Sequence, residues 1–353
     1  MIKELKGQGV DMKCNLIKQG YPQGSCFTEV EGGKSLACEA TLKKTDNGLL
    51  RLISAVHLSR PENYLSIYQS GCNFSCRKCH SWTFTQVAKG NWWSPNDVLK
   101  ACKEYEKGVT LREPRSKATA FHAHDSCRCC GACVMNGKRS PLCPKVIQKK
   151  DILLSPQGWG PARNIVAFTG GDLTCCPEYY IQCAQLIKAE TNLWVLIETN
   201  GYGLTPQNLD ALKEAGVDSF WLDIKAYDGT DHKWLTGCFN RNILKLPEEI
   251  VKRGFVLEVL SLYIPNLVET PQLKKVAQLI FDIDPLIPFT ILAFFPEYQM
   301  KRYKSPKVSE MVGTYHEVKA IGLRNVRLAN TGIFASSEQD YHFLKKKVGV
   351  GNY

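Results

Sequence analysis

Three cysteines in one short segment carry the most specific chemical signal in this 353-residue sequence. Cys72, Cys76 and Cys79 follow a predicted strand, so their thiolates can converge on one centre from a single loop. Iron–sulfur clusters are usually held by four cysteines, and three would leave one iron of a [4Fe–4S] cluster open to a further ligand. The alternative is a zinc loop completed by His80 or by a distant cysteine.

A second cysteine group lies further along the chain. Cys127, Cys130 and Cys133 follow a CxxCxxC pattern, and nine residues separate Cys133 from Cys143. The segment has little apolar content, which indicates that a bound metal stabilises it. An auxiliary [4Fe–4S] cluster is favoured because the pattern is similar to half of a ferredoxin motif. The last interval in ferredoxins is three residues, so a mononuclear iron or zinc on four thiolates remains the alternative.

The chain has 16 cysteines in all, and disulfides are a poor explanation for them in a reducing compartment. Cys129 is a spare thiol of the second group, where His122 or His124 could replace a ligand, although such histidines are more often solvated. Cys175 and Cys176 could bind metal or donate a hydrogen atom, but buried thiols are the simpler interpretation. We interpret the single cysteines as small buried hydrophobes: Cys14, Cys26, Cys38, Cys102, Cys183 and Cys238.

Strands and helices must alternate to position these groups. Ser94 followed by Pro95 predicts a helix over 94–107. Beyond it, apolar strands are separated by helices of ten or more residues, which predicts a parallel sheet. About six such units, the first opening at Tyr64, predict an α/β fold with a partial (β/α)6 barrel. Its polar segments fall at the carboxyl ends of strands, where such barrels place their chemistry: SGCN, TGGD, ETNG, DIKAYD, FFPEY and NTG.

We expect four regions along the chain. A small β-rich segment covers 1–66, with a hairpin at the DNG turn. The barrel core covers 67–335 and is interrupted by the Cys-rich insertion at 108–163. A tail covers 336–353.

The composition is that of a globular protein, with 44% hydrophobic and 22% charged residues. No apolar run is long enough to span a membrane, and the first residues are too charged for a signal peptide, so we expect a cytoplasmic protein without a membrane partner. The net charge of +11 favours solubility or an anionic partner such as an acidic protein. No block of five like charges occurs, so we expect no nucleic-acid partner.

Taken in order, these motifs resemble the radical S-adenosylmethionine (radical SAM) superfamily over about residues 64–335, apart from the insertion. The CxxxCxxC segment is followed by TGGD, ETNG and DIK at successive strand ends. Within the superfamily, the segments LDIKAYDGTDHKWLTGCFNRNIL, IPNLVETPQLKKVAQLI and FFPEYQM resemble the pyruvate formate-lyase activating enzymes and their relatives.

The resemblance implies that Cys72, Cys76 and Cys79 ligate a [4Fe–4S] cluster whose open iron is chelated by S-adenosylmethionine. Reduction of the cluster would cleave the cofactor and release a 5′-deoxyadenosyl radical. The GGD edge would meet the methionine amino group, ETN would lie near the ribose and carboxylate, and DIK would reach the cofactor from the next strand. The implied cofactor-binding residues are Gly170, Gly171, Asp172, Glu198, Thr199, Asn200, Asp223 and Lys225.

The sequence departs from the family pattern at two positions. Asp172 stands where glutamate is usual after the glycines, and it still supplies a carboxylate acceptor. Lys78 stands where an aromatic residue commonly precedes the third cysteine. Phe74 and Trp82 are therefore the candidates for shielding the cluster.

The resemblance also implies hydrogen abstraction from a backbone Cα of a large protein, with ferredoxin or flavodoxin as electron donor. The Asp-Gly-Pro-Gly-x-Arg stretch usual in glycyl-radical activases is absent from 1–66. Its absence favours protein C-methylation, as in the methyl-coenzyme M reductase glutamine methylases, over glycyl-radical installation. Those methylases use cobalamin, but no DxHxxG signature occurs, so cobalamin would bind without a protein histidine or not at all. A non-catalytic iron–sulfur carrier or maturation scaffold is the alternative outside the enzymes.

Overall fold

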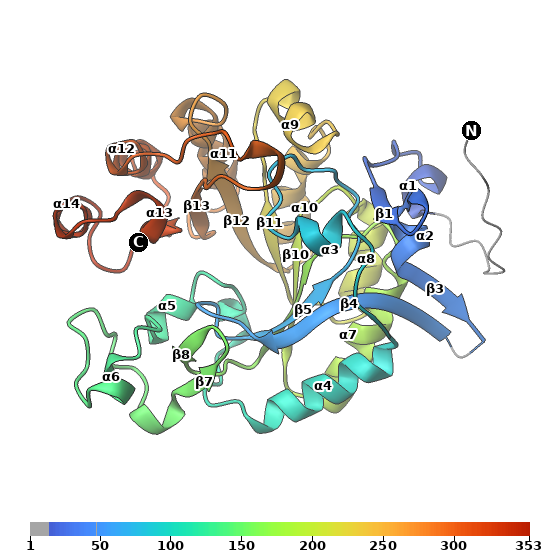
Figure 1. Ribbon diagram of the computed structural model, residues 1–353, viewed down its shortest axis with the longest axis horizontal. Coiled ribbons are helices and arrows are strands. Elements are labelled where there is room, and N and C mark those ends of the chain that lie inside the picture. Colours follow the sequence, from blue (N-terminus) through green and yellow to red (C-terminus); the bar gives the residue numbers. More distant parts are fainter. Residues whose placement is uncertain (1–13, 47) are drawn as a thin grey trace.

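A computed structural model describes residues 14–46 and 48–353 of the protein. Its centre is a ten-stranded mixed sheet in the order β14-β13-β12-β11-β10-β9-β5-β4-β3, with β6 beside β4 (Figure 1). All neighbouring pairs from β5 to β14 are parallel, which confirms the predicted parallel sheet and is consistent with a partial barrel.

The parallel strands coincide with the apolar runs of the sequence. They are β5 (Leu65–Gln69), β9 (Ile165–Gly170), β10 (Trp194–Thr199), β11 (Ser219–Asp223), β12 (Val256–Tyr263), β13 (Phe289–Ala293) and β14 (Val326–Ala329). The remaining strands are shorter or antiparallel: β1 (Phe27–Val30), β2 (Gly33–Leu36), β3 (Leu42–Thr45), β4 (Gly48–Leu58), β6 (Asn91–Trp93), β7 (Leu153–Ser155) and β8 (Gly158–Gly160).

Helices connect the parallel strands where the periodicity predicts them. Ser94 caps α4, with Pro95 in the first turn, and its side chain accepts a hydrogen bond from the backbone N–H of Asp97. The longer helices are α4 (Pro95–Lys107), α7 (Glu178–Glu190), α8 (Pro206–Glu214), α9 (Gly229–Thr236), α10 (Leu246–Lys252), α11 (Thr270–Phe281), α12 (Val308–Lys319) and α14 (Glu338–Lys347). The short ones are α1 (Asn15–Lys18), α2 (Ala37–Thr41), α3 (Trp82–Thr85), α5 (Ala123–Ser126), α6 (Ala132–Met135) and α13 (Thr331–Phe334).

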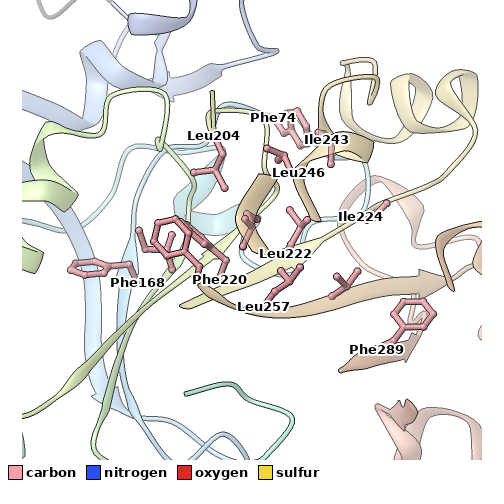
Figure 2. Packing of buried hydrophobic residues seen from close by; sticks show 14 of the residues in the cluster. Phe74, Phe168, Leu204, Phe220, Leu222, Ile224, Ile243, Leu246, Leu257 and Phe289 are labelled. Carbon is pink, nitrogen blue, oxygen red and sulfur yellow. The ribbon is translucent and has the colours of Figure 1, made fainter. Parts of the chain in front are cut away.

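Each parallel strand has two different faces. One face carries side chains such as Phe168, Phe220 and Leu257, which pack into the main hydrophobic core beneath the helices (Figure 2). The other face of β9 and β10 carries Ile165, Ala167 and Leu196, which form a smaller cluster with Tyr64 and Ala118. The alternation follows from the period of two in a strand.

The N-terminal segment joins the same sheet. The predicted hairpin is present, because β3 and β4 pair as antiparallel strands with Thr45 opposite Gly48. Strand β4 then pairs with β5, so the segment extends the sheet beyond its parallel part. At the other end, the backbone N–H of Leu328 donates to the carbonyl of Asn352, and Leu344 of α14 is fully buried. The C-terminal residues therefore dock against β14.

The insertion contains only short elements, in keeping with the lack of periodicity in 108–163. Arg163, at its end, has no exposed surface. Its guanidinium pairs with the carboxylate of Glu113 and donates to the carbonyls of Glu62, Thr119 and Lys117. This one side chain therefore connects the insertion to the segment that precedes β5.

Across 14–46 and 48–353, no helix is both long and apolar enough to cross a lipid bilayer.

We expect the Arg163→Met substitution to lower the free energy of unfolding by about 3–5 kcal/mol, because it leaves the Glu113 carboxylate and three carbonyls without their buried partner. Urea denaturation followed by circular dichroism measures this change. The control is Arg112→Met, since Arg112 is 54% exposed and pairs with Glu106 at 3.6 Å; its loss should cost at most about 1 kcal/mol. Equal effects of the two substitutions would contradict the anchoring role.

Candidate active site

The loop after β5 places three thiols at the carboxyl end of the parallel sheet. Burial raises the pKa of Cys72 to about 12, and burial also raises the pKa of Cys76 well above its ordinary value. Cys79 lies close enough to influence the ionisation of both. A bound metal would offset this cost, because metal binding favours the thiolate over the thiol. The chemistry of these donors therefore fits a metal cluster.

The Asp172 carboxylate joins the loops that follow β9 and β10. One oxygen accepts from the backbone N–H and the hydroxyl of Thr174, both at 2.8 Å. The other accepts from the Thr199 hydroxyl at 2.6 Å and the Asn200 N–H at 2.9 Å. The carbonyl of Asp172 also accepts from the N–H of Asn73 at 2.9 Å. Both carboxylate oxygens are thus engaged with protein donors, and the side chain positions the loops around it.

Asn200 reaches the cysteine loop directly. Its side-chain amide donates to the Oδ1 of Asn73 at 2.6 Å and lies 3.7 Å from the Cys72 sulfur. The amide nitrogen of Asn73 is buried and has no hydrogen-bond partner among the described residues. Asn73 was missed as a site residue by sequence reasoning, although it stands inside the CxxxCxxC motif.

The two glycines after β9 allow the loops to meet. A Cβ on Gly171 would lie 2.0 Å from the carbonyl oxygen of Gly71, and one on Gly170 would lie 2.7 Å from the Phe84 ring. Gly170 also has a φ of +84°, which favours glycine. The GG pair therefore lets the end of β9 pack directly against the start of the cysteine loop.

Arg51 is a second residue that sequence reasoning missed. It is fully buried on β4, and its Nη2 donates to the carbonyl of Ser70 at 3.1 Å and of Gly171 at 3.3 Å. It therefore joins the cysteine loop to the GGD turn from the other side. A single arginine within the apolar run LLRLISAV was the available signal.

The end of β11 brings an ion pair to the same loop. Lys225 pairs with the Oδ2 of Asp223, while the buried Oδ1 of Asp223 has no partner among the described residues. Burial would lower the pKa of Lys225, but Asp223 and the thiols of Cys76 and Cys79 outweigh burial and raise it. A cation held beside these cysteines and an unused carboxylate oxygen fit a charged cofactor at the cluster.

The Glu198 side chain points from β10 toward the smaller hydrophobic cluster that contains Tyr64. Its carboxyl accepts from the hydroxyls of Thr169 at 2.6 Å and Tyr64 at 2.8 Å. Burial raises the pKa of Glu198 to about 8, and it outweighs the opposite effect of the Thr169 hydrogen bond.

Aromatic side chains cover the cysteine loop from the segment after β13. Phe295 lies 3.5 Å from the Lys78 ammonium, and Tyr298 stacks on Trp82 with ring centroids 5.0 Å apart. Burial and the nearby Lys225 lower the pKa of Lys78 to about 8. Phe74 instead packs in the main core. Phe295 thus supplies aromatic cover beside the position where the family commonly has an aromatic residue.

The insertion gathers its cysteines around one pocket. Cys127, Cys130, Cys133 and Cys143 all line it, and Cys129 does not. The Cys129 thiol instead lies 3.2 Å from the Oδ1 of Asn63. The histidines lie outside the pocket lining: His122 bonds Asp125 at 2.8 Å, and His124 lies 3.2 Å from Arg128.

A third cysteine group emerges only in three dimensions. The sulfur atoms of Cys14, Cys175 and Cys176 all lie within 4.8 Å of one another. In the described part of the chain, this is the one group of three potential ligands with so short a mutual spacing. The sequence does not predict this group, because Cys14 is interpreted there as a buried core residue and not as a partner of Cys175 and Cys176.

Comparisons with known proteins agree with this architecture. Residues 127–280 match the sequence profile of the Radical SAM superfamily. The chain therefore contains a radical SAM domain, which confirms the resemblance seen in the sequence. The matched range includes GGD, ETN and DIK but begins after Cys72, Cys76 and Cys79, so the cluster ligands stay a prediction.

The similar proteins of known name include activating enzymes. The chain is 31% identical over 117 residues to an inferred glycyl-radical enzyme activating enzyme of Methanocaldococcus jannaschii, covering 32% of this chain and 43% of that protein. It is 24% identical over 204 residues to the 4-hydroxyphenylacetate decarboxylase activating enzyme of Clostridium scatologenes, covering 54% of this chain and 64% of that one. These matches therefore span less than two thirds of either relative.

Among solved structures, a domain of pyruvate-formate lyase-activating enzyme from Bacteroides vulgatus aligns with 47% of this chain and 98% of its own. The sequence identity is 16% and the TM-score is 0.41.

We expect the Glu198→Gln variant to gain stability relative to the wild type as the pH rises from about 4.5 to about 8. In that window the unfolded chain loses the Glu198 proton near the ordinary pKa of 4.5, while the native carboxyl, with its pKa raised to about 8, keeps it. Wild-type stability therefore falls with rising pH through this group, and the amide removes that contribution.

Unfolding free energies measured in urea across this pH range test the expectation. Glu104→Gln, on the exposed surface of α4, is the control for losing one carboxyl. Parallel pH curves for the Glu198→Gln variant and the wild type would contradict the burial effect.

Proposed function

We propose that this protein is a radical SAM enzyme that holds a [4Fe–4S] cluster through Cys72, Cys76 and Cys79. The observation that carries the proposal is the convergence of these thiols with Asn200 and with the Asp223–Lys225 pair at the carboxyl end of the sheet. The radical SAM domain supports it independently. The three sulfur atoms do not all lie within 4.8 Å of one another, in keeping with thiolates that bind three different irons.

The residues around the cluster loop have distinct tasks in this proposal. When bound, the reduced cluster and S-adenosylmethionine supply a 5′-deoxyadenosyl radical that removes a hydrogen atom from the substrate. Lys225 places a positive charge beside Cys76 and Cys79. The free Oδ1 of Asp223 offers an acceptor, and the free amide of Asn73 offers a donor. Asp172 holds the loops that carry these groups.

We further propose that the hydrogen atom comes from a backbone Cα of a protein substrate. The names of the two relatives support activation of another enzyme, and one of them specifies a glycyl-radical enzyme. The absence of the Asp-Gly-Pro-Gly-x-Arg stretch from 1–66 instead favours C-methylation at the same kind of carbon. The net charge of +11 suits an acidic protein partner and an acidic electron donor of the ferredoxin or flavodoxin type.

We expect anaerobically reconstituted protein to produce 5′-deoxyadenosine from S-adenosylmethionine after dithionite reduction, and Cys76→Ser to reduce the yield to the background without enzyme. Mass spectrometry of the products measures both. The control is Cys183→Ser, because Cys183 is a fully buried thiol on α7 outside the loop and should leave the yield unchanged.

Two outcomes refine or reject the proposal. S-adenosylhomocysteine that accumulates only with added methylcobalamin would assign methylation, whereas 5′-deoxyadenosine alone would support glycyl-radical installation. If a wild-type sample with an intact cluster does not cleave S-adenosylmethionine, the proposal of an enzyme is rejected in favour of a non-catalytic scaffold.

The insertion pocket is proposed as a second iron–sulfur site. Its four cysteines line one pocket, an arrangement that fits four thiolate ligands around a shared metal centre. No three of their sulfur atoms lie within 4.8 Å of one another, a spacing wider than a single ion needs. An auxiliary cluster is therefore favoured over a mononuclear metal.

We expect Cys133→Ser to remove about four irons and the matching sulfide from reconstituted protein, because the auxiliary cluster loses a ligand. Cys129→Ser, which alters a thiol outside the pocket lining, should retain both. Iron and acid-labile sulfide analysis measures the difference. Loss of a single metal without sulfide would indicate a mononuclear site, and unchanged content would contradict the site altogether.

A further inference from the structure

The third cysteine group has the composition of a complete metal site. Besides the three sulfur atoms that lie within 4.8 Å of one another, the thiol of Cys38 lies beside that of Cys176, which makes Cys38 the candidate for a fourth ligand. All four cysteines are free of disulfides. Cys38, Cys175 and Cys176 are buried, and Cys14 is half-buried.

The four thiols come from three separate segments. Cys14 directly precedes α1, Cys38 lies on α2, and the Cys175–Cys176 pair lies in the loop between β9 and α7. These segments also contact through the backbone, because the N–H of Asn15 donates to the carbonyl of Cys175 at 3.1 Å. The thiols are therefore brought together by the fold rather than by a local motif.

The surrounding backbone holds the Cys175–Cys176 pair in place. The N–H of Cys176 donates to the carbonyl of Leu173 at 2.8 Å. A Cβ on Gly203 would lie 2.2 Å from the nitrogen of Cys175, so the loop after β10 packs directly against the pair. Rigid support of this kind is what positions metal ligands precisely.

We infer that Cys14, Cys175 and Cys176 bind a single metal ion, zinc or iron, and that Cys38, beside Cys176, completes a tetrahedral four-thiolate site. Four sulfurs at about 2.3 Å from one tetrahedral ion lie about 3.8 Å apart. The sulfur atoms of Cys14, Cys175 and Cys176 lie within 4.8 Å of one another, which approaches that value. A polynuclear cluster would hold its thiolates on different irons and so further apart. Each thiol that binds gives up its proton to solvent.

The bound ion would fasten the N-terminal segment to the catalytic edge of the sheet. Cys175 follows Asp172 by three positions in the same loop, and Asp172 organises the residues around the candidate cluster. The insertion (α5, α6, β7 and β8) lies at the opposite side of the molecule from α1 and α2 (Figure 1). The inferred ion is therefore separate from the auxiliary site of the insertion, and it acts as a structural clamp.

Metal analysis of the full-length chain tests the inference. We expect Cys176→Ser and Cys38→Ser each to lose about one equivalent of zinc or iron, without loss of sulfide, relative to the wild type. The control is Cys102→Ser, since Cys102 is a fully buried thiol on α4 outside the group and should keep the wild-type content. The other cysteine groups remain intact in every variant. The metal that they bind is therefore the same in all samples and does not contribute to the difference in metal content.

A spectroscopic measurement covers the case in which a variant fails to fold. Cadmium-113 NMR of the cadmium-loaded wild-type chain should show a four-thiolate resonance that disappears selectively in the milder Cys14→Ser variant. Hydrogen exchange should also increase over residues 15–41 in that variant, and not over 270–281. Unchanged metal content in all three serine variants, or a disulfide within the group in non-reduced peptide mapping, would overturn the inference.

Discussion

The hydrogen bonds of the Asp172 carboxylate are the interaction on which the candidate site depends. Three residues donate to its two oxygens, and they come from the loops that follow β9 and β10. The carbonyl of the same residue fixes Asn73 in the cysteine loop. Because Asp172 is only 4% exposed, its donors would have no water to replace it. The side chain and backbone carbonyl of this one residue thereby hold the ends of three neighbouring parallel strands in a common arrangement.

Buried arginines complete this framework, although of the Arg51 guanidinium nitrogens only Nη2 has hydrogen-bond partners among the described residues. Arg51 lies against carbonyls of the cysteine loop and the GGD turn, and Arg163 lies against the insertion. Such groups are costly inside a protein unless their hydrogen bonds are made. Their placement at the junctions between segments means that the same interactions that satisfy the charges also fix the geometry around the site.

The cysteines show which groups of thiols can be predicted from their spacing along the chain and which cannot. Within the first and second groups the thiols lie in single loops, and the structure keeps each group together. Cys14 and Cys38 were interpreted as core residues, yet they meet the pair after the GGD turn. Their meeting depends on how α1 and α2 pack against the sheet, and a sequence pattern carries no information about that packing.

The sequence by itself determined the parallel sheet, the helix boundaries near Ser94 and the order of motifs along the strand ends. These features follow from periodicity, capping and loop spacing, which act over a few residues. Only the tertiary structure decided that Asp172 positions loops with both oxygens occupied, that Arg51 and Asn73 belong to the site, and that the distant thiol of Cys14 meets those of Cys175 and Cys176. Those outcomes depend on contacts between segments far apart in the chain, and such contacts exist only once the sheet and its loops have packed.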